Sequence, residues 1–323
     1  MPRHPLCVPD FHGHTIEDVI LLGQQLQVAH NITALMARSP FVHYQVNTTK
    51  LILHHHPHDR SAGDLVKEIQ RDVYGMRQFW SRDATQNRNI LLDIGGHIGA
   101  TAITFVKMHP AATAYTFEPA PLNFFYLAWN TVLNRVSHSV ILRNQGVTSD
   151  GLPFTIEYSP DNTMSSRRAS LGHSWGSLRK QQHVVRTMPL PLLIQECVAK
   201  EVTTVKLDCE GCEFSIVPNH PEFFSRSNQR IMGEYHARHV RDNFWSGHAG
   251  NVSEDAIKNT WHILCDRPSH ADGGADCIEW LSCVGSHTAA GGSRDGGRYY
   301  GNPMNDRKQA AHSSILPDVR ICA

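Results

Sequence analysis

The stretch "LLDIGGHIGA", residues 91–100, decides the fold. It begins as an apolar run that ends at Asp93, and it then turns through three glycines, Gly95, Gly96 and Gly99. Glycine permits left-handed backbone angles and lets backbone amides approach a ligand closely. The positive N-terminus of a helix that follows such a turn attracts an anion. Taken alone, the stretch predicts a tight turn from a strand into a helix and leaves open whether the turn binds a cofactor.

The chain on both sides of this stretch alternates short apolar runs with longer helical patterns. The short runs are "AYTFE" (114–118), "SVILRN" (139–144), "TTVKLD" (203–208) and "RIMGEYH" (230–236). Helical spacing is found in "ATAITFVKMH" (100–109) and "PLNFFYLAWNTVLN" (121–134), where Pro121 suits the first turn of a helix. Alternating strands and helices predict an α/β fold with a parallel sheet and helices on both faces.

We expect three regions along the chain. Residues 1–80 have mainly helical spacing and are predicted to form an N-terminal helical extension or lid. Residues 81–285 hold the α/β domain, in which two strand-like runs flank a polar loop at 159–177. Residues 286–323 are rich in Gly and Ser, and we expect a flexible loop followed by a C-terminal strand.

Composition limits the classes of partner. Of the 323 residues, 41% are hydrophobic, and the 30 Lys and Arg residues balance the 30 Asp and Glu residues. A balanced charge gives no long-range attraction to nucleic acid or to an anionic membrane surface. The apolar run near the N-terminus is too short and polar for a membrane span or a signal peptide. The sequence therefore predicts a globular, cytoplasmic protein.

Acidic residues end four of the predicted strands. They are Asp93, Glu118, Asp208 and Glu234, and the polar segment 144–146 ends a fifth strand. Ligands of doubly wound sheets bind beyond the carboxyl ends of the strands, so these side chains should gather at one edge. One such acid alone is most simply a helix cap or a solvated residue, but four together favour a ligand site.

Glu118 indicates the kind of ligand. It lies 25 residues after Asp93, where a carboxylate can accept both hydrogen bonds of a ribose diol. A nicotinamide-binding turn would read G-x-G-x-x-G, whereas this turn reads D-x-G-x-H-x-G. An acid ahead of the first glycine favours S-adenosylmethionine, whose methionine end offers an ammonium to acids and a carboxylate to amides.

Four segments resemble the FkbM-type S-adenosylmethionine-dependent methyltransferases. They are "LLDIGGHIGATAITF" (91–105), "YTFEPAPLNFFYLAWNTVLN" (115–134), "VKLDCEGCEFSIV" (205–217) and "MGEYH" (232–236), and the resemblance covers residues 60–240. It implies a class I methyltransferase fold, Rossmann-like, with a mostly parallel seven-stranded sheet that includes one antiparallel strand. It also implies O-methylation of a hydroxyl on a small molecule, sugar or lipid.

The resemblance also implies which residues contact S-adenosylmethionine. Asp93, Gly95, Gly96 and Gly99 are expected around the methionine end. Glu118 and Pro119 are expected at the ribose, and Gln145 and Gly146 near the adenine. His97 lies at the lip of this pocket, where we expect it to brace the loop. Asn130 and Asn134 are expected to brace structure as well.

Asp208 is the first candidate for the residue that anchors the acceptor or removes its proton, and it also borders the cofactor. Glu234 and His236, at the next strand end, are its expected partners. Methyl transfer to an alcohol needs alignment of the reactants and removal of a weakly acidic proton. A divalent cation held by these three residues is a minor alternative to a site without metal.

Other features have simpler interpretations. Cys209 and Cys212 have C-x-x-C spacing without the second pair that a zinc site needs, so we interpret them as incidental and the eight cysteines as reduced. The run "HHHPHD" (54–59) is interpreted as a loop, and the segment "SSRR" (165–168) leaves open whether it binds an anionic acceptor.

A non-catalytic module that keeps the cofactor pocket is the alternative function.

Overall fold

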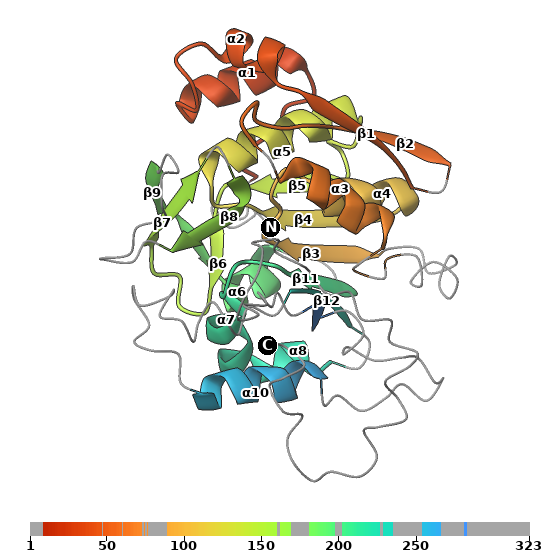
Figure 1. The fold of residues 1–323 in the computed structure, drawn as a ribbon. Helices are drawn as coiled ribbons and strands as arrows, with labels where there is room; N and C mark the ends of the chain where they lie inside the picture. The colour runs from red at the N-terminus through yellow and green to blue at the C-terminus, as the bar shows by residue number, and fades with distance from the viewer. Residues whose placement is uncertain are drawn as a thin grey trace, which may run out of the picture.

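A parallel sheet forms the centre of the molecule. The computed structural model describes residues 9–46, 48–59, 61–72, 74, 76, 89–159, 162–168, 181–197, 202–226, 229–234, 254–265 and 281–282. The strands have the order β13-β12-β11-β3-β4-β5, and each pair is parallel (Figure 1). They are β3 (Ile90–Ile94), β4 (Thr113–Phe117), β5 (Val140–Arg143), β11 (Thr204–Leu207), β12 (Arg230–Glu234) and β13 (Leu281–Ser282). The chain order reverses between β3 and β11, which is the switch point where ligands of such sheets bind.

The predicted α/β fold is confirmed, whereas the expected seven strands, one of them antiparallel, stay a prediction. Within the described residues the sheet has six strands, and the expected antiparallel strand is not among them. Parallel pairing follows from the helical crossovers between successive strands. The strand expected at the C-terminal end of the chain lies outside the described residues.

Helices cover both faces of the sheet because its strands are apolar on both faces. All five residues of β3 are buried, and successive side chains enter two different apolar clusters. Leu91 packs on the face covered by α4 (Ala100–Met108) and α5 (Pro121–Leu133). Leu92 packs on the opposite face. That face is covered by α6 (Leu190–Leu192), the π-helical turn η3 (Leu193–Cys197), α7 (Glu213–Asn219), α8 (Pro221–Phe224) and α10 (Glu254–Cys265).

The N-terminal layer is mixed, whereas a mainly helical extension was expected over residues 1–80. It contains α1 (Ile16–Gln25), α2 (Ile32–Arg38), an antiparallel hairpin of β1 (Phe41–Val46) and β2 (Thr49–His54), and α3 (Ala62–Gln70). The hairpin forms because buried residues alternate along β2, where Leu51 and Leu53 face the core. α3 ends at Gln70, and Asp72 then has a left-handed φ of 56°.

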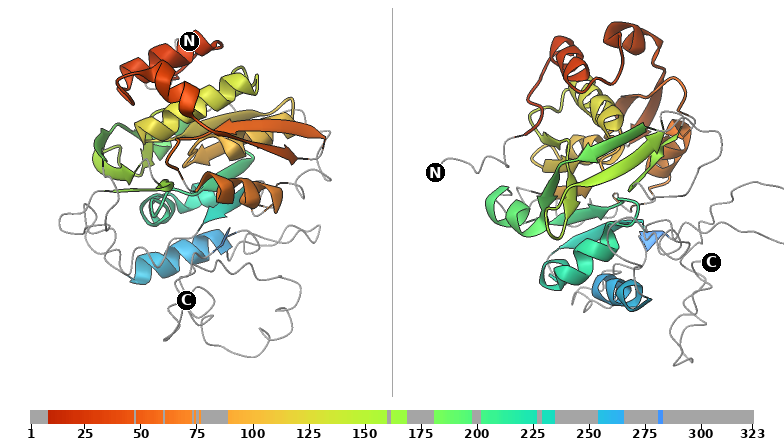
Figure 2. Two further views of the ribbon diagram at one scale, coloured as in Figure 1. Left: turned by 45° about the horizontal axis from the view of Figure 1, so that its top comes forward. Right: turned by 90° about the vertical axis from the view of Figure 1, so that its left-hand side faces the viewer.

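The N-terminal layer shares one apolar core with the helices on its side of the sheet. In Figure 2, α1 and α2 lie over α5, at the end of the molecule opposite α10. Val19 of α1 and Leu53 of β2 belong to the same buried cluster as Phe124 of α5. The layer is therefore part of the packed structure.

Asn130 of α5 and Asn134, the C-cap residue of this helix, hold the edge of β2. Asn130 accepts a hydrogen bond from the His54 amide at 2.7 Å and donates one to the His54 carbonyl at 3.0 Å. Asn134 makes the matching pair with the amide and carbonyl of Ile52, at 3.2 and 2.7 Å. Asn130 also donates to the Ile98 carbonyl in the glycine turn, at 2.9 Å. The predicted bracing role of both asparagines is confirmed.

Two small sheets flank the switch point. β6 (Gly146–Thr148) pairs in parallel with β10 (Thr187–Pro189), and β7 (Phe154–Ser159) pairs antiparallel with β8 (Asn162–Arg168) and β9 (Gln181–Val185). The loop expected at 159–177 thus contains a strand, β8. Its composition, "NTMSSRR", is polar, so it lacks the apolar alternation that predicts strands.

Candidate functional site

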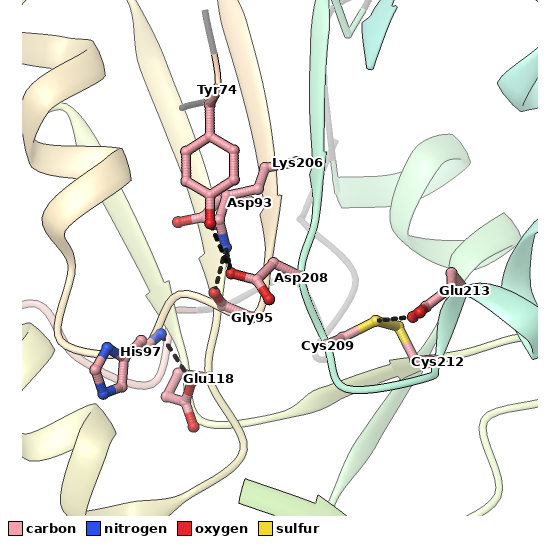
Figure 3. A network of polar contacts seen from close by, with 10 residues as sticks. All are labelled: Tyr74, Asp93, Gly95, His97, Glu118, Lys206, Asp208, Cys209, Cys212 and Glu213. Carbon is pink, nitrogen blue, oxygen red and sulfur yellow. Dashed lines mark hydrogen bonds and ion pairs between the residues drawn. A yellow bond between two sulfur atoms is a disulfide. The ribbon is translucent and has the colours of Figure 1, made fainter. Parts of the chain in front are cut away.

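Asp93, Glu118 and Asp208 lie at the carboxyl edge of the central sheet, and Asp93 and Asp208 meet through Lys206 between β3 and β11 (Figure 3). Asp93 lies within β3, Glu118 directly follows β4, and Asp208 directly follows β11. Glu234 ends β12, whose Gly233 pairs with Leu207, so the Glu234 backbone follows alongside that of Asp208. The Glu234 side chain and the whole of His236 lie outside what the structure describes.

A buried lysine that sequence reasoning missed joins two of these acids. Lys206 pairs directly opposite Asp93, and its Nζ lies 3.3 Å from Asp93 Oδ1 and 3.3 Å from Asp208 Oδ2. The same Nζ donates to the Gly95 carbonyl at 2.7 Å. Burial works against the charge, but Asp208 and Asp93 outweigh it and raise the pKa of Lys206. The sequence could have indicated this contact. Lys206 lies two residues before Asp208, and alternate residues of an extended chain share a face.

One ammonium here faces two carboxylates. The side chain of Asp93 is fully buried, and burial raises its pKa even though Lys206 acts in the opposite direction. The ion pair with Lys206, at 3.3 Å from Oδ1, is the printed contact of this carboxylate, and within the described part of the chain no donor meets it in ideal hydrogen-bond geometry. Because buried polar atoms are nearly always hydrogen-bonded, Asp93 can take a further cationic or hydrogen-bond-donating group.

Tyr74 connects the segment after α3 to this network. Its hydroxyl donates to Asp208 Oδ2 at 2.9 Å, and its ring centroid lies 5.8 Å from Lys206 Nζ. Tyr74 is 1% exposed, whereas the Asp208 side chain is 26% exposed. Asp208 is thus held from two elements at the open edge of the site. No sequence pattern singled out Tyr74.

The glycines of residues 95–99 allow close packing of the protein on itself. A Cβ at Gly95 would lie 1.8 Å from the Asp208 carbonyl oxygen, and Gly95 has a φ of 91°. A Cβ at Gly96 would lie 2.2 Å from the Thr116 side chain. The amides of Gly95 and Gly96 both donate to the Phe117 carbonyl, at 3.0 and 2.8 Å. These amides already have a structural partner, and cofactor contact by Gly95, Gly96 and Gly99 stays a prediction.

Glu118 is tied to the glycine turn through His97. The His97 amide donates to Glu118 Oε2 at 2.8 Å, and the Ala120 amide donates to Oε1 at 2.8 Å. Burial raises the pKa of Glu118 to about 7 despite these donors. His97 has a left-handed φ of 49°, and burial lowers the pKa of its ring to about 4, so the imidazole is neutral at pH 7. The backbone contact supports the bracing role expected of His97.

The residues expected near an adenine follow β5. The Asn144 side chain donates to the carbonyls of Glu118 and Pro119, at 2.9 and 3.2 Å, and so fixes their turn. Gln145 is 3% exposed, and its Oε1 accepts no hydrogen bond within the described residues. The Gly146 amide donates to the Arg186 carbonyl at 2.9 Å. Gln145 therefore has hydrogen-bonding capacity for a bound group.

The C-x-x-C pair is a disulfide, so the prediction that it is incidental and reduced is wrong. The Cα atoms of Cys209 and Cys212 lie 5.4 Å apart across a turn in which Glu210 and Gly211 have left-handed φ values of 57° and 109°. The buried Glu213 carboxylate accepts the Gly211 amide at 3.0 Å and lies 3.5 Å from Cys209 Sγ. Figure 3 shows this loop beside Asp208.

The histidine run at residues 54–59 packs onto α5. The His54 ring stacks on that of Trp129, with centroids 4.0 Å apart. Asp59 accepts the Ser61 amide at 2.9 Å just before α3. These contacts attach the chain between the hairpin and α3 to α5 and to the start of α3.

No helix among the described residues is long and apolar enough to cross a membrane.

Comparison with known proteins identifies the family. No curated protein gives a significant match. Among solved structures, a crystal structure from Pyrococcus horikoshii, described provisionally as a transferase, aligns at 17% identity and a TM-score of 0.25 over 33% of this chain and 36% of its own length. That TM-score carries no inference about fold or function. The methyltransferase FkbM domain matches residues 93–266, more than half of the chain. This match spans Asp93, Glu118 and Asp208, so the chain belongs to the FkbM methyltransferase family.

Proposed function

We propose that the protein is an S-adenosylmethionine-dependent O-methyltransferase that acts on a hydroxyl of a small molecule, sugar or lipid. The observation that carries the proposal is the charge imbalance at the switch point, where Lys206 faces both Asp93 and Asp208. S-adenosylmethionine carries an ammonium and a sulfonium, and positive charge is favourable beside an excess of carboxylate over ammonium.

The residues present fit the three parts of this cofactor. Asp93 is a buried carboxylate with capacity for the ammonium. Glu118 can accept the hydrogen bonds of the ribose diol, and Gln145 Oε1 can accept one from the adenine amino group. When bound, the cofactor supplies an electrophilic methyl group on its sulfonium.

Asp208 is the residue we assign to the acceptor. Its carboxylate is held by Lys206 and Tyr74 and reaches the open edge of the site. There it can accept a hydrogen bond from the acceptor hydroxyl and orient its oxygen. Orientation contributes on the order of 7–11 kcal/mol in the best model systems, and a general base adds roughly a hundred- to ten-thousand-fold in rate. Glu234 and His236 remain the proposed partners of Asp208.

Calorimetric titration tests the cofactor. We expect S-adenosylmethionine and S-adenosylhomocysteine to bind and NAD not to bind. Glu118→Gln and Asp93→Asn should weaken binding at least tenfold, because each replaces a carboxylate that a cofactor donor would use. Absence of binding to both S-adenosyl ligands would overturn the proposal.

Release of S-adenosylhomocysteine across a panel of alcohols, sugars and hydroxylated lipids tests the transfer. Turnover on one acceptor class supports the O-methyltransferase, whereas binding with no turnover on any acceptor favours the non-catalytic module. Repeating the assay with EDTA and with added magnesium tests whether a divalent cation takes part.

A further inference from the structure

The Cys209–Cys212 disulfide borders the proposed cofactor site. Cys209 directly follows Asp208, and a Cβ at Gly95 would lie 1.8 Å from the Asp208 carbonyl oxygen and 3.4 Å from the Cys209 Cα. The disulfide loop and the glycine turn therefore pack backbone against backbone. Lys206 adds a hydrogen bond to the Gly95 carbonyl at this contact. A rearrangement of the loop that moves the Asp208 carbonyl toward Gly95 would displace the turn, because a Cβ does not fit between them.

The geometry of this loop suits reversible opening. Both cysteines are partly exposed, so a small thiol can reach them. The bond joins residues three apart in sequence, and so short a loop restricts the unfolded chain least, which makes the bond a weak structural cross-link. It also closes a turn in which Glu210, a non-glycine residue, is left-handed, and this conformation is unfavourable on its own.

The reduced form has a hydrogen-bond partner in place. Cys209 Sγ lies 3.5 Å from Glu213 Oε2, and a thiol at this position can donate to the carboxylate. In the disulfide the sulfur has no proton to donate. Both redox forms of the pair are therefore accommodated, and opening the bond lets Glu210 leave its left-handed conformation.

We propose that Cys209 and Cys212 form a thiol–disulfide exchange site for small thiols, and that the disulfide form binds S-adenosylmethionine more tightly. The second part rests on the proposed function. In the exchange, the thiolate of a small thiol attacks one sulfur, the bond between the cysteines breaks, and a mixed disulfide forms. A second small thiol then releases it, so that two small thiols are oxidised to one disulfide while the protein disulfide takes up two electrons and two protons.

Mass spectrometry tests the exchange on the full-length protein. Trypsin cleavage after Lys206 and Arg226 releases the peptide 207–226, whose two cysteines are Cys209 and Cys212. After oxidised glutathione and then iodoacetamide, the peptide should carry no alkyl group. After millimolar reduced glutathione it should carry two. Two alkyl groups under both conditions, or none under both, would overturn the exchange site.

Calorimetry of S-adenosylhomocysteine tests the coupling. We expect the Kd of the oxidised wild type to be about fivefold lower than that of the reduced protein. The C209S/C212S variant should bind like the reduced protein under both conditions, and C265S, altered at the end of α10, should behave like wild type. Equal Kd values for the two forms of wild type would overturn the coupling. Failure of wild type to bind in either form would instead refute the proposed function, while the peptide assay would still decide the exchange.

Discussion

Replacing Lys206 by Met removes an ammonium but keeps an unbranched apolar side chain of similar length. The Lys206 side chain is 4% exposed, so Asp93 and Asp208 would be left facing each other with little water to replace the lost charge. The hydrogen bond to the Gly95 carbonyl would also be lost. Removing one partner of a buried ion pair costs about 3–5 kcal/mol, and we expect a loss of this size in the free energy of unfolding.

Urea unfolding followed by circular dichroism at pH 7.5 measures this loss. Lys67→Met is the matched control, because Lys67 pairs with Asp64 at 3.0 Å but the two side chains are 60% and 53% exposed. An exposed pair contributes at most about 1 kcal/mol, so the control should unfold nearly like wild type. Adding Asp93→Asn to Lys206→Met should restore part of the stability, because it removes one of the two carboxylate charges that Lys206 had balanced.

The pH dependence of the variant gives a second check. Burial already raises the pKa of Asp93 above 3.8, and loss of Lys206 would raise it further. A carboxyl whose pKa is raised by folding destabilises the protein as pH rises through the interval between its unfolded and folded pKa values. The cost of Lys206→Met should therefore be smaller at pH 5 than at pH 7.5. A cost below about 1 kcal/mol at pH 7.5 would refute the reasoning.

Three further predictions concern ligand binding and the core. Because burial raises the pKa of Glu118 to about 7 and a bound diol favours the ionised form, the affinity for S-adenosylhomocysteine should fall as pH decreases below 7 and level off above it. Calorimetry across this range should give a flat profile for Glu118→Gln. Asp208→Asn should leave the Kd within about threefold of wild type and depress turnover, and the opposite result would reverse our division of roles. Asn130→Ala should lower the free energy of unfolding by about 2–4 kcal/mol, since it leaves three buried or partly buried backbone groups unpaired. The exposed Asn219→Ala, measured in the same denaturant series, should cost less than about 1 kcal/mol.

The sheet and its acidic edge were predictable because their signals are local. β3 is buried throughout and β4 and β5 are mostly buried, and the acid or amide that follows the apolar run is read directly from the sequence. Parallel topology then brings Asp93, Glu118 and Asp208 to one edge whatever the details of packing.

The features that sequence reasoning missed depend on contacts between distant residues. The hydrogen bond from Tyr74 to Asp208 joins positions 134 residues apart. Lys206 was overlooked because its role depends on the residue beside it in the next strand of the sheet, Asp93. The sequence does not show which residues of two strands lie side by side. The disulfide follows from the left-handed turn at residues 210–211, which C-x-x-C spacing alone does not specify.

Asn130 of α5 and its C-cap Asn134 bear on where the folding unit begins. Residues four apart on a helix rise about 6 Å, nearly the same as residues two apart on a strand, so Asn130 and Asn134 imitate a neighbouring strand for β2. The family match starts at residue 93, after β2. A fragment cut at that boundary would present two unmatched amides and the apolar surface of α5 to water. We therefore expect the smallest autonomously folding unit to include the hairpin and to begin before the first residue of the family match.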